Sequence, residues 1–269
     1  MLTDITLGQY LPGESIIHKL DPRTKILLTI AYIASLFFVN SIVGFAFCAL
    51  FMGVVLHIAG IPLKFILKSI KPLWIFVAFT AVINLFMTDG RIIFQVWVIK
   101  ATWEGLYLAI IMALRLVFLV VGTSVLTYTT SPIVLTDGIE HLLSPFRKIK
   151  VPAHEIAMMM TIAIRFIPTI IEETDKLMKA QSARGADFES GNLIARAKAM
   201  VPILVPLFVS AFRRADELAL AMECRCYHGG DHRTKMKQLH MQRMDAGASI
   251  VTLAAIALLI ALRYIPGLV

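Results

Sequence analysis

Charged residues are scarce in this chain, and that scarcity excludes an ordinary soluble domain. Only 16% of the 269 residues are charged and 58% are hydrophobic, whereas soluble globular domains have about 25% charged and about 45–50% apolar residues. The apolar residues are gathered into long runs, and the mean hydropathy is +0.78. The composition therefore predicts a membrane protein, provided that the runs are long enough to cross a bilayer.

Cysteine is also scarce, which argues against a disulfide framework. Cys48 lies inside an apolar run, and Cys224 and Cys226 lie in a segment that we expect to be cytosolic. Structural disulfides are rare in that compartment, so we expect none. A secretory signal peptide is not expected either, because the N-terminus carries Asp4 and Glu14, lacks a basic n-region and reaches its first apolar run only after Lys25.

Catalytic motifs are missing from the chain, which disfavours an enzyme. No G-x-x-x-x-G-K-[ST] sequence is present, so any ATP must be bound by a partner. His154-Glu155 resembles the start of a zincin motif, but Met158 stands where the second histidine belongs, and no G-x-S-x-G follows elsewhere. We expect neither catalysis nor a cofactor; an intramembrane enzyme with a scattered site is the alternative.

The net charge of +8 admits two interpretations. Nucleic-acid binding is one, but the basic residues are not interleaved with aromatic residues as in a single-strand binding surface. The other is the excess of Lys and Arg that keeps cytoplasmic loops on their side of the membrane. We favour the second, because the basic residues flank the apolar runs, and we expect no nucleic-acid partner.

The fold class expected is an all-α polytopic membrane protein with about five transmembrane helices. The expected spans are Ile26–Val39, Ile42–Ile61, Leu73–Met87, Glu104–Tyr128 and Gly247–Ile265. The first is short for the roughly 20 residues that a span needs. Residues 1–128 would hold the first four spans, 129–246 a cytosolic section of long helices, and 247–269 the last span. Basic loops then place the N-terminus in the cytosol and the C-terminus outside.

Two basic features within the apolar part each have two interpretations. Lys64, Lys68 and Lys71 recur at i, i+4 and i+7 within Ile61–Pro72, as in an amphipathic helix lying on an anionic leaflet or in an ordinary cytoplasmic loop. Arg115 lies inside the fourth expected span, where a charge is costly. It is either a structural residue satisfied by carbonyl groups or by snorkelling, or a residue with a gating or coupling role.

The cytosolic section is predicted to contain two long helices, 154–184 and 201–226. Each begins apolar all round and ends polar, which indicates a helix rooted against the membrane part with its C-terminal half in water. A plain cytosolic helical domain would show the same pattern. The two helix ends also match at an offset of 41 residues, in the pairs Asp175 and Asp216, Leu177 and Leu218, Ala180 and Ala221, and Arg184 and Arg225.

Each of these helices ends in a triplet centred on arginine. Ala183-Arg184-Gly185 is typical of a helix terminus, where Gly supplies the left-handed cap and Arg complements the helix dipole. Cys224-Arg225-Cys226 lacks the glycine, so capping explains it less well. An arginine on a projecting helix end can also donate to carboxylates and carbonyls of a partner groove.

The second helix end contains four residues of metal-ligating types. Cys224, Cys226, His228 and His232 are close in sequence, but cysteines at i and i+2 point to nearly opposite sides of a helix. The spacing does not match a standard zinc motif. We therefore expect no metal.

The combination of these features resembles the transmembrane T-component (EcfT family) of energy-coupling factor transporters, which are vitamin and metal uptake systems related to ABC transporters. The opening Pro12-Gly13-Glu14-Ser15-Ile16-Ile17-His18-Lys19-Leu20-Asp21-Pro22-Arg23-Thr24-Lys25 is similar to that family's N-terminus, and an X-Arg-X pair at two cytosolic helix ends is its signature. The resemblance covers essentially the whole chain.

The resemblance implies a non-catalytic subunit in the cell (plasma) membrane of a prokaryote. Its coupling helices would bind two cytosolic ABC-type ATPase subunits, and its membrane part would hold a substrate-binding S-component. Ala183, Arg184 and Gly185 match the first motif. Arg225 matches the second, in which Ala commonly precedes Arg and a small residue follows it; Cys224 and Cys226 stand there instead.

A self-contained permease is the main alternative function. It should show paired carboxylates within the membrane or inverted hydropathy repeats, and the near absence of charge in the spans disfavours it. Their charged residues are Arg115, Glu104 at one edge and Arg263 near the far end. The unequal triplets favour two different ATPases, and the chain alone does not name the vitamin or ion that is carried.

Overall fold

The computed structural model describes residues 10–96, 99–186, 188, 192–229 and 238–263. The chain divides into two compact units, and each is treated separately below. We call Ile139–Lys237 the helix-pair unit, and Gly8–Gly138 together with Gln238–Val269 the membrane unit.

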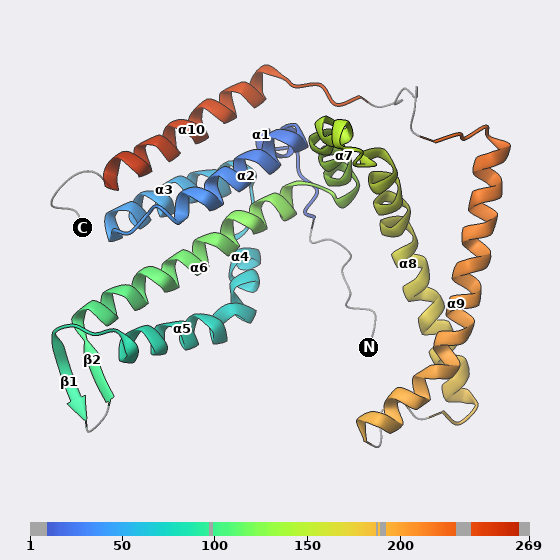
Figure 1. The fold of residues 1–269 in the computed structure, drawn as a ribbon, viewed down its shortest axis with the longest axis horizontal. Helices are drawn as coiled ribbons and strands as arrows, with labels where there is room; N and C mark the ends of the chain where they lie inside the picture. Colours follow the sequence, from blue (N-terminus) through green and yellow to red (C-terminus); the bar gives the residue numbers. More distant parts are fainter. Residues whose placement is uncertain (1–9, 97–98, 187, 189–191, 230–237, 264–269) are drawn as a thin grey trace. The chain divides into compact units, whose positions relative to one another are not determined.

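The membrane unit is built from helices, with one short hairpin (Figure 1). Its elements are α1 Ile16–Lys19, α2 Pro22–Leu36, α3 Ile42–Ala59, α4 Leu63–Ile70, the 3₁₀ turn η1 Lys71–Leu73, α5 Trp74–Met87, β1 Ile92–Val96, β2 Ile99–Thr102, α6 Trp103–Thr129 and α10 Arg243–Arg263. Helix α7, Pro132–Leu143, runs across the boundary into the helix-pair unit, which contains η2 Ser144–Ile149, α8 Ala153–Ala183 and α9 Leu193–Cys224. The all-α prediction is confirmed. The segment between the third and fourth expected spans includes the antiparallel pair β1 and β2.

Helix starts and stops in the membrane unit follow local side-chain chemistry. Asp21 accepts the amide hydrogen of Arg23 ahead of α2, with Pro22 in the first turn, where a proline needs no amide hydrogen. Ser41 caps α3 and Thr102 caps α6 in the same way. Gly60, with φ of 68°, ends α3 in the left-handed conformation that glycine adopts without strain.

Five helices of the described chain are long and apolar enough to cross a membrane. They are Ile42–Ala59, Leu63–Met87, Trp103–Thr129, Ala153–Ala183 and Arg243–Leu262. The number agrees with the prediction, but the membership differs in two places. Helix α2 has only 15 residues, which is about 22 Å and less than the roughly 30 Å hydrocarbon core. Helix α8 meets the length and hydropathy criteria because its first half is apolar.

Helix α6 forms the centre of the membrane unit, since α2, α3, α4 and α5 all pack against it. The buried core includes Tyr32 and Leu36 of α2 and Tyr128 of α6. Gly122 of α6 allows the closest approach: a Cβ there would lie 2.5 Å from the ring of Tyr32. A larger residue at this position would force α2 and α6 apart.

Arg115 of α6 binds the turn between α2 and α3. Its Nη2 donates to the carbonyl oxygen of Val39 at 2.8 Å and to Oδ1 of Asn40 at 3.0 Å. The guanidinium also lies over the Phe37 ring, 5.9 Å from its centroid. Tyr107 adds a hydrogen bond to the Asn40 carbonyl at 3.0 Å. These contacts favour the structural interpretation of Arg115 over the gating one.

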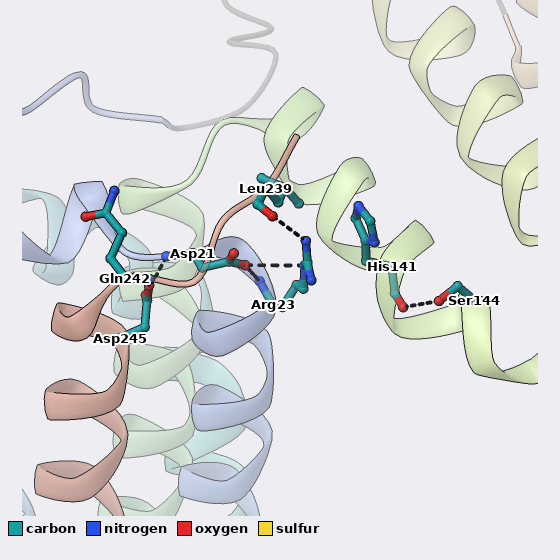
Figure 2. A network of polar contacts seen from close by, with 7 residues as sticks. All are labelled: Asp21, Arg23, His141, Ser144, Leu239, Gln242 and Asp245. Atoms are coloured by element: carbon teal, nitrogen blue, oxygen red, sulfur yellow. Dashed lines mark hydrogen bonds and ion pairs between the residues drawn. The ribbon is translucent and has the colours of Figure 1, made fainter. Parts of the chain in front are cut away.

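A buried polar junction joins the start of α10 to the start of α2 (Figure 2). Oδ1 of Asp245 accepts the Asp21 amide hydrogen at 2.7 Å, and its Oδ2 accepts that of Gln242 at 2.7 Å. Arg23 donates to the carbonyl oxygen of Leu239 at 3.0 Å. Asp21 and Asp245 are both buried. The last helix is thereby fixed beside the first long one, although more than 200 residues separate them in sequence.

Candidate functional site at the ends of two long helices

The helix-pair unit contains the two long helices that the sequence predicts, with different bounds. Helix α8 has 31 residues and ends at Ala183. Helix α9 has 32 residues and begins at Leu193 rather than at 201. Pro202 and Pro206 lie inside α9, and Figure 1 shows that this helix bends. A proline removes a backbone hydrogen bond and kinks a helix. The turns from Leu193 to Met200 come before this kink, and the helix continues through it.

The end of α8 is a Schellman cap. Gly185 has φ of +92°, and its amide donates to the Ser182 carbonyl at 3.0 Å. The amide of Ala186 reaches back to the Gln181 carbonyl at 3.0 Å. Together these two bonds satisfy carbonyl groups that a helix end leaves without partners. Arg184 is the C-cap residue and is exposed to solvent.

The end of α9 repeats this cap bond for bond. Cys226 takes the left-handed place with φ of 57°, and its amide donates to the Glu223 carbonyl at 2.9 Å. The amide of Tyr227 donates to the Met222 carbonyl at 3.0 Å. Arg225 is the exposed C-cap residue. The expectation that capping explains this end less well is wrong, because a cysteine adopts the conformation that glycine has in α8.

Each cap presents one arginine, and the two arginines are not brought together. Figure 1 shows that α8 and α9 end at opposite ends of the helix pair. Within the described chain, neither guanidinium has a hydrogen-bond or ion-pair partner. A free guanidinium on a fixed helix end can donate two parallel hydrogen bonds to a carboxylate or carbonyl groups. The site therefore consists of two separate, similar donors.

The two helices cross at a contact between residues that correspond to each other under the offset of 41. Arg214 of α9 donates to Oε2 of Glu173 in α8 at 3.1 Å, and these residues are 41 positions apart. Ser210 also donates to Glu173, and the Arg214 guanidinium lies over the Phe166 ring at 5.7 Å. The offset of 41 that aligns the helix ends thus also describes the contact between them.

This crossing divides the pair into two arms of equal length. Arg184 follows Glu173 by 11 residues, and Arg225 follows Arg214 by 11 residues. At about 1.5 Å per residue each arm extends roughly 16 Å from the crossing to its arginine. Carboxylates at Glu172, Glu173 and Asp175 are typical of a solvated helix face, so residue types alone do not predict this contact. The offset of 41 was the signal that could have found it.

The apolar halves of α8 and α9 are largely exposed within this chain. Large apolar side chains with more than a third of their surface exposed are Met159, Ile167, Ile170, Ile194, Met200, Val201, Leu204, Val205, Phe208, Val209, Phe212 and Leu220. Soluble monomers rarely expose an apolar patch of this extent. The patch therefore indicates a surface that lipid or another protein covers.

The cysteines beside Arg225 do not complete a metal cluster among the residues that the structure describes. Cys224 and Cys226 are free and exposed. His228 is also exposed. His232, the fourth residue of the possible site, lies outside the described residues.

Comparison with known proteins gives one consistent result. A family model described as "Cobalt transport protein" matches residues 13–236. A curated protein of Thermosediminibacter oceani is 59% identical over 251 residues, covering 93% of this chain and 95% of the relative. Relatives from Clostridium kluyveri and Bacillus subtilis are 57% and 46% identical; both alignments cover 98% of this chain, with 98% and 100% of the respective relative. All three are named "Energy-coupling factor transporter transmembrane protein EcfT".

Proposed function

The chain belongs to the family of energy-coupling factor transporter transmembrane proteins, and we propose that it transmits the motion of two cytosolic ATPases to a substrate-binding S-component. It is a multi-pass membrane component of a transporter and not the subunit that does chemistry. The observation that carries this proposal is the pair of caps with the same backbone hydrogen-bond pattern, each with one exposed arginine at its tip.

The caps explain how a helix end can carry force. An arginine at the tip of a rigid helix follows the helix axis, and the two backbone bonds of the cap prevent the last turn from fraying. A partner groove with carboxylates or carbonyl groups would hold such a guanidinium at a defined angle. Closure of two ATPase subunits on each other would then move α8 and α9 about their crossing.

The equal arms support two related ATPase partners. Because the crossing contact and both caps obey the same offset, the helix pair has an approximate internal two-fold relation. Two ATPases that share a fold would meet equivalent arms. The caps differ in side chains, with Gly185 in one and Cys226 in the other, and this difference favours an ATPase heterodimer over a homodimer.

The exposed apolar half of the helix pair supports a hydrophobic partner. We propose that the S-component covers part of this patch, and that it selects the vitamin or other micronutrient. Under this proposal, one transmembrane component has no need to recognise the substrate itself. The family model's name refers to cobalt transport, and the carried substrate of the present transporter would likewise be decided by its S-component.

A self-contained permease is the second candidate function, and the membrane unit has few of the features that a permease needs. A cavity of about 560 Å³ lies among α1, α2, α3, α6 and α10, and its lining is almost entirely aliphatic and aromatic. Lys25 is the charged residue of this lining, and its Nζ already donates to the carbonyl oxygens of His18 and Thr129 at 3.0 Å each. Paired carboxylates, which ion-coupled permeases use, do not line this cavity.

Co-purification tests the proposal directly. The tagged chain would be extracted in mild detergent from its native membrane, as wild type, as Arg184→Glu, as Arg225→Glu and as the double variant. We expect wild type to bring down P-loop ATPases and a small hydrophobic subunit. Each single variant should lose one ATPase contact, and the double variant should lose the ATPases while it keeps the hydrophobic subunit.

A matched control separates the helix ends from charge in general. Lys176→Glu with Arg213→Glu places the same charge change on exposed sites of α8 and α9 away from the tips. This control should retain both ATPases. If it loses them as completely as the tip variant, the arginines have no special role. If wild type purifies alone and transports substrate without ATPases, the permease candidate replaces the proposal.

The proposed orientation places the N-terminus and the helix-pair unit in the cytosol and the C-terminus outside, which requires α2, lengthened by its flanking residues, to make the first of five crossings. The exposed thiols of Cys224 and Cys226 provide a natural probe, since Cys48 is buried. A membrane-impermeant maleimide should label them in permeabilised cells and not in intact ones. Labelling in intact cells would contradict this orientation, and it would agree with a membrane crossing by α8.

A further inference from the structure

Helix α4 carries an exposed row of lysines between two apolar helices of the membrane unit. Lys64 and Lys68 lie on α4 and Lys71 lies in the turn η1 that follows it; all three side chains are exposed. Spacings of four and three residues put them within about 60° of each other around the helix axis. They form one basic stripe along its length.

An apolar stripe runs alongside the lysines and is equally exposed. Leu63, Leu67 and Trp74 have 69%, 66% and 68% of their surface exposed. At about 100° per residue, Leu63 and Leu67 lie about 40° apart and next to the basic stripe. An ordinary cytoplasmic loop requires the lysines alone. It does not require leucine and tryptophan side chains held in the open beside them.

The third side of α4 is attached to α6, which fixes how the helix is rotated. Ile66 is 5% exposed and belongs to the core of the membrane unit. Tyr128 of α6 hydrogen-bonds with Ser69 Oγ at 2.6 Å and donates to the Phe65 carbonyl oxygen at 3.2 Å. Because these contacts fix the rotation of α4 about its axis, the basic and apolar stripes both face outward.

We propose that α4 is an interfacial helix that binds anionic phospholipids of the leaflet it lies on. The leucine stripe would enter the acyl region, and the lysines would contact phosphate groups at the level of the headgroups. Trp74, the first residue of α5, suits the same boundary because tryptophan prefers the membrane–water interface. A planar boundary between apolar and anionic layers matches two parallel stripes better than a protein groove does.

Titration of the purified full-length chain with phosphatidylglycerol and with phosphatidylcholine in detergent tests this proposal. We expect wild type to prefer phosphatidylglycerol and to lose the preference as salt is raised. Each lysine near an anionic surface contributes about a fivefold gain in affinity. Lys64→Gln with Lys68→Gln and Lys71→Gln should therefore weaken phosphatidylglycerol binding by on the order of a hundredfold, with little effect on phosphatidylcholine.

Two further variants make the result specific to α4. Replacing the same three lysines by arginine keeps the charge and should keep the preference. Replacing Lys176, Lys179 and Lys198 of the helix-pair unit by glutamine removes equal charge from other exposed positions and should change nothing. Equal binding of both lipids by wild type would overturn the proposal. So would a loss in the helix-pair control as large as in the α4 variant.

Discussion

The two helix caps make a reciprocal prediction about backbone strain. Gly185 and Cys226 occupy the same left-handed place, with φ of 92° and 57°. A side chain in this conformation costs roughly 1–2 kcal/mol, because its Cβ approaches the following carbonyl oxygen. We therefore expect Cys226→Gly to strengthen the α9 cap and Gly185→Ala to weaken the α8 cap.

The size of each effect follows from the surroundings. Beyond the adjacent backbone, no described atom lies within 4 Å of the place that a Cβ would take at Gly185, so the cost of alanine there is a backbone cost. The backbone cost is partly offset, because replacing glycine reduces the entropy of the unfolded chain by about 0.4–1 kcal/mol. The net change is about 1 kcal/mol in each direction, which is about a fivefold change in the equilibrium for opening the cap.

Hydrogen exchange at the residue that closes each cap measures this equilibrium. In Gly185→Ala, the Ala186 amide should exchange about fivefold faster than in wild type, after correction for intrinsic rates. In Cys226→Gly, the Tyr227 amide should exchange about fivefold more slowly. Both amides donate the long-range bond of their cap at 3.0 Å.

Cys224→Ala is the control, because it removes a neighbouring thiol from a residue that is already helical. It should leave the exchange of Tyr227 close to that of wild type. If Cys226→Gly accelerates exchange, or if Gly185→Ala has no effect, then the left-handed residue does not limit the stability of the helix end. The two caps would then have the same hydrogen-bond geometry, but the left-handed residue would not determine their stability.

Three other substitutions test contacts elsewhere in the chain, each by thermal unfolding in detergent. Arg115→Met should lower stability by about 1–3 kcal/mol, because the Val39 carbonyl loses its charged donor; an unchanged midpoint would refute the structural role. A double-mutant cycle of Glu173→Gln and Arg214→Gln should give a coupling of about 1 kcal/mol, modest because the pair is partly exposed; strict additivity would mean that the contact is incidental. Asp245→Ala should destabilise more than Asp245→Asn, because the amide side chain keeps one acceptor; the reverse order would show that charge matters more than hydrogen bonding there.

The sequence predicts the helices of this fold well because apolar runs and capping residues act locally. Asp21-Pro22 begins α2 and Gly185 ends the cap of α8, as local rules require. The left-handed Cys226 could not be predicted in this way, because residues other than glycine seldom adopt that conformation. It takes the place that Gly185 has at the other helix end, and only a comparison of the two distant segments reveals this correspondence.

Contacts between elements were harder to predict from the sequence than the elements themselves. The pattern that marks Arg115 as costly does not say that its partners lie in the turn after α2. Likewise, a run of carboxylates around Glu173 has the composition of a solvated helix face, and only the packing of α9 on α8 gives it a partner. The predicted helix boundaries were least accurate where prolines lie inside a helix. Pro202 suggests a start at 201, whereas α9 begins at Leu193.

The offset of 41 residues gains its meaning from where it recurs. Four matched residue types in ten positions are weak evidence of a repeat. The same offset, however, relates every backbone bond of the two caps and joins Glu173 to Arg214 at the crossing. A chance similarity of composition would not place the contact point equally far from both arginines. Under the proposed function, the equal arms would serve two related partners, and a shift of either helix by one turn should impair coupling even with both arginines present.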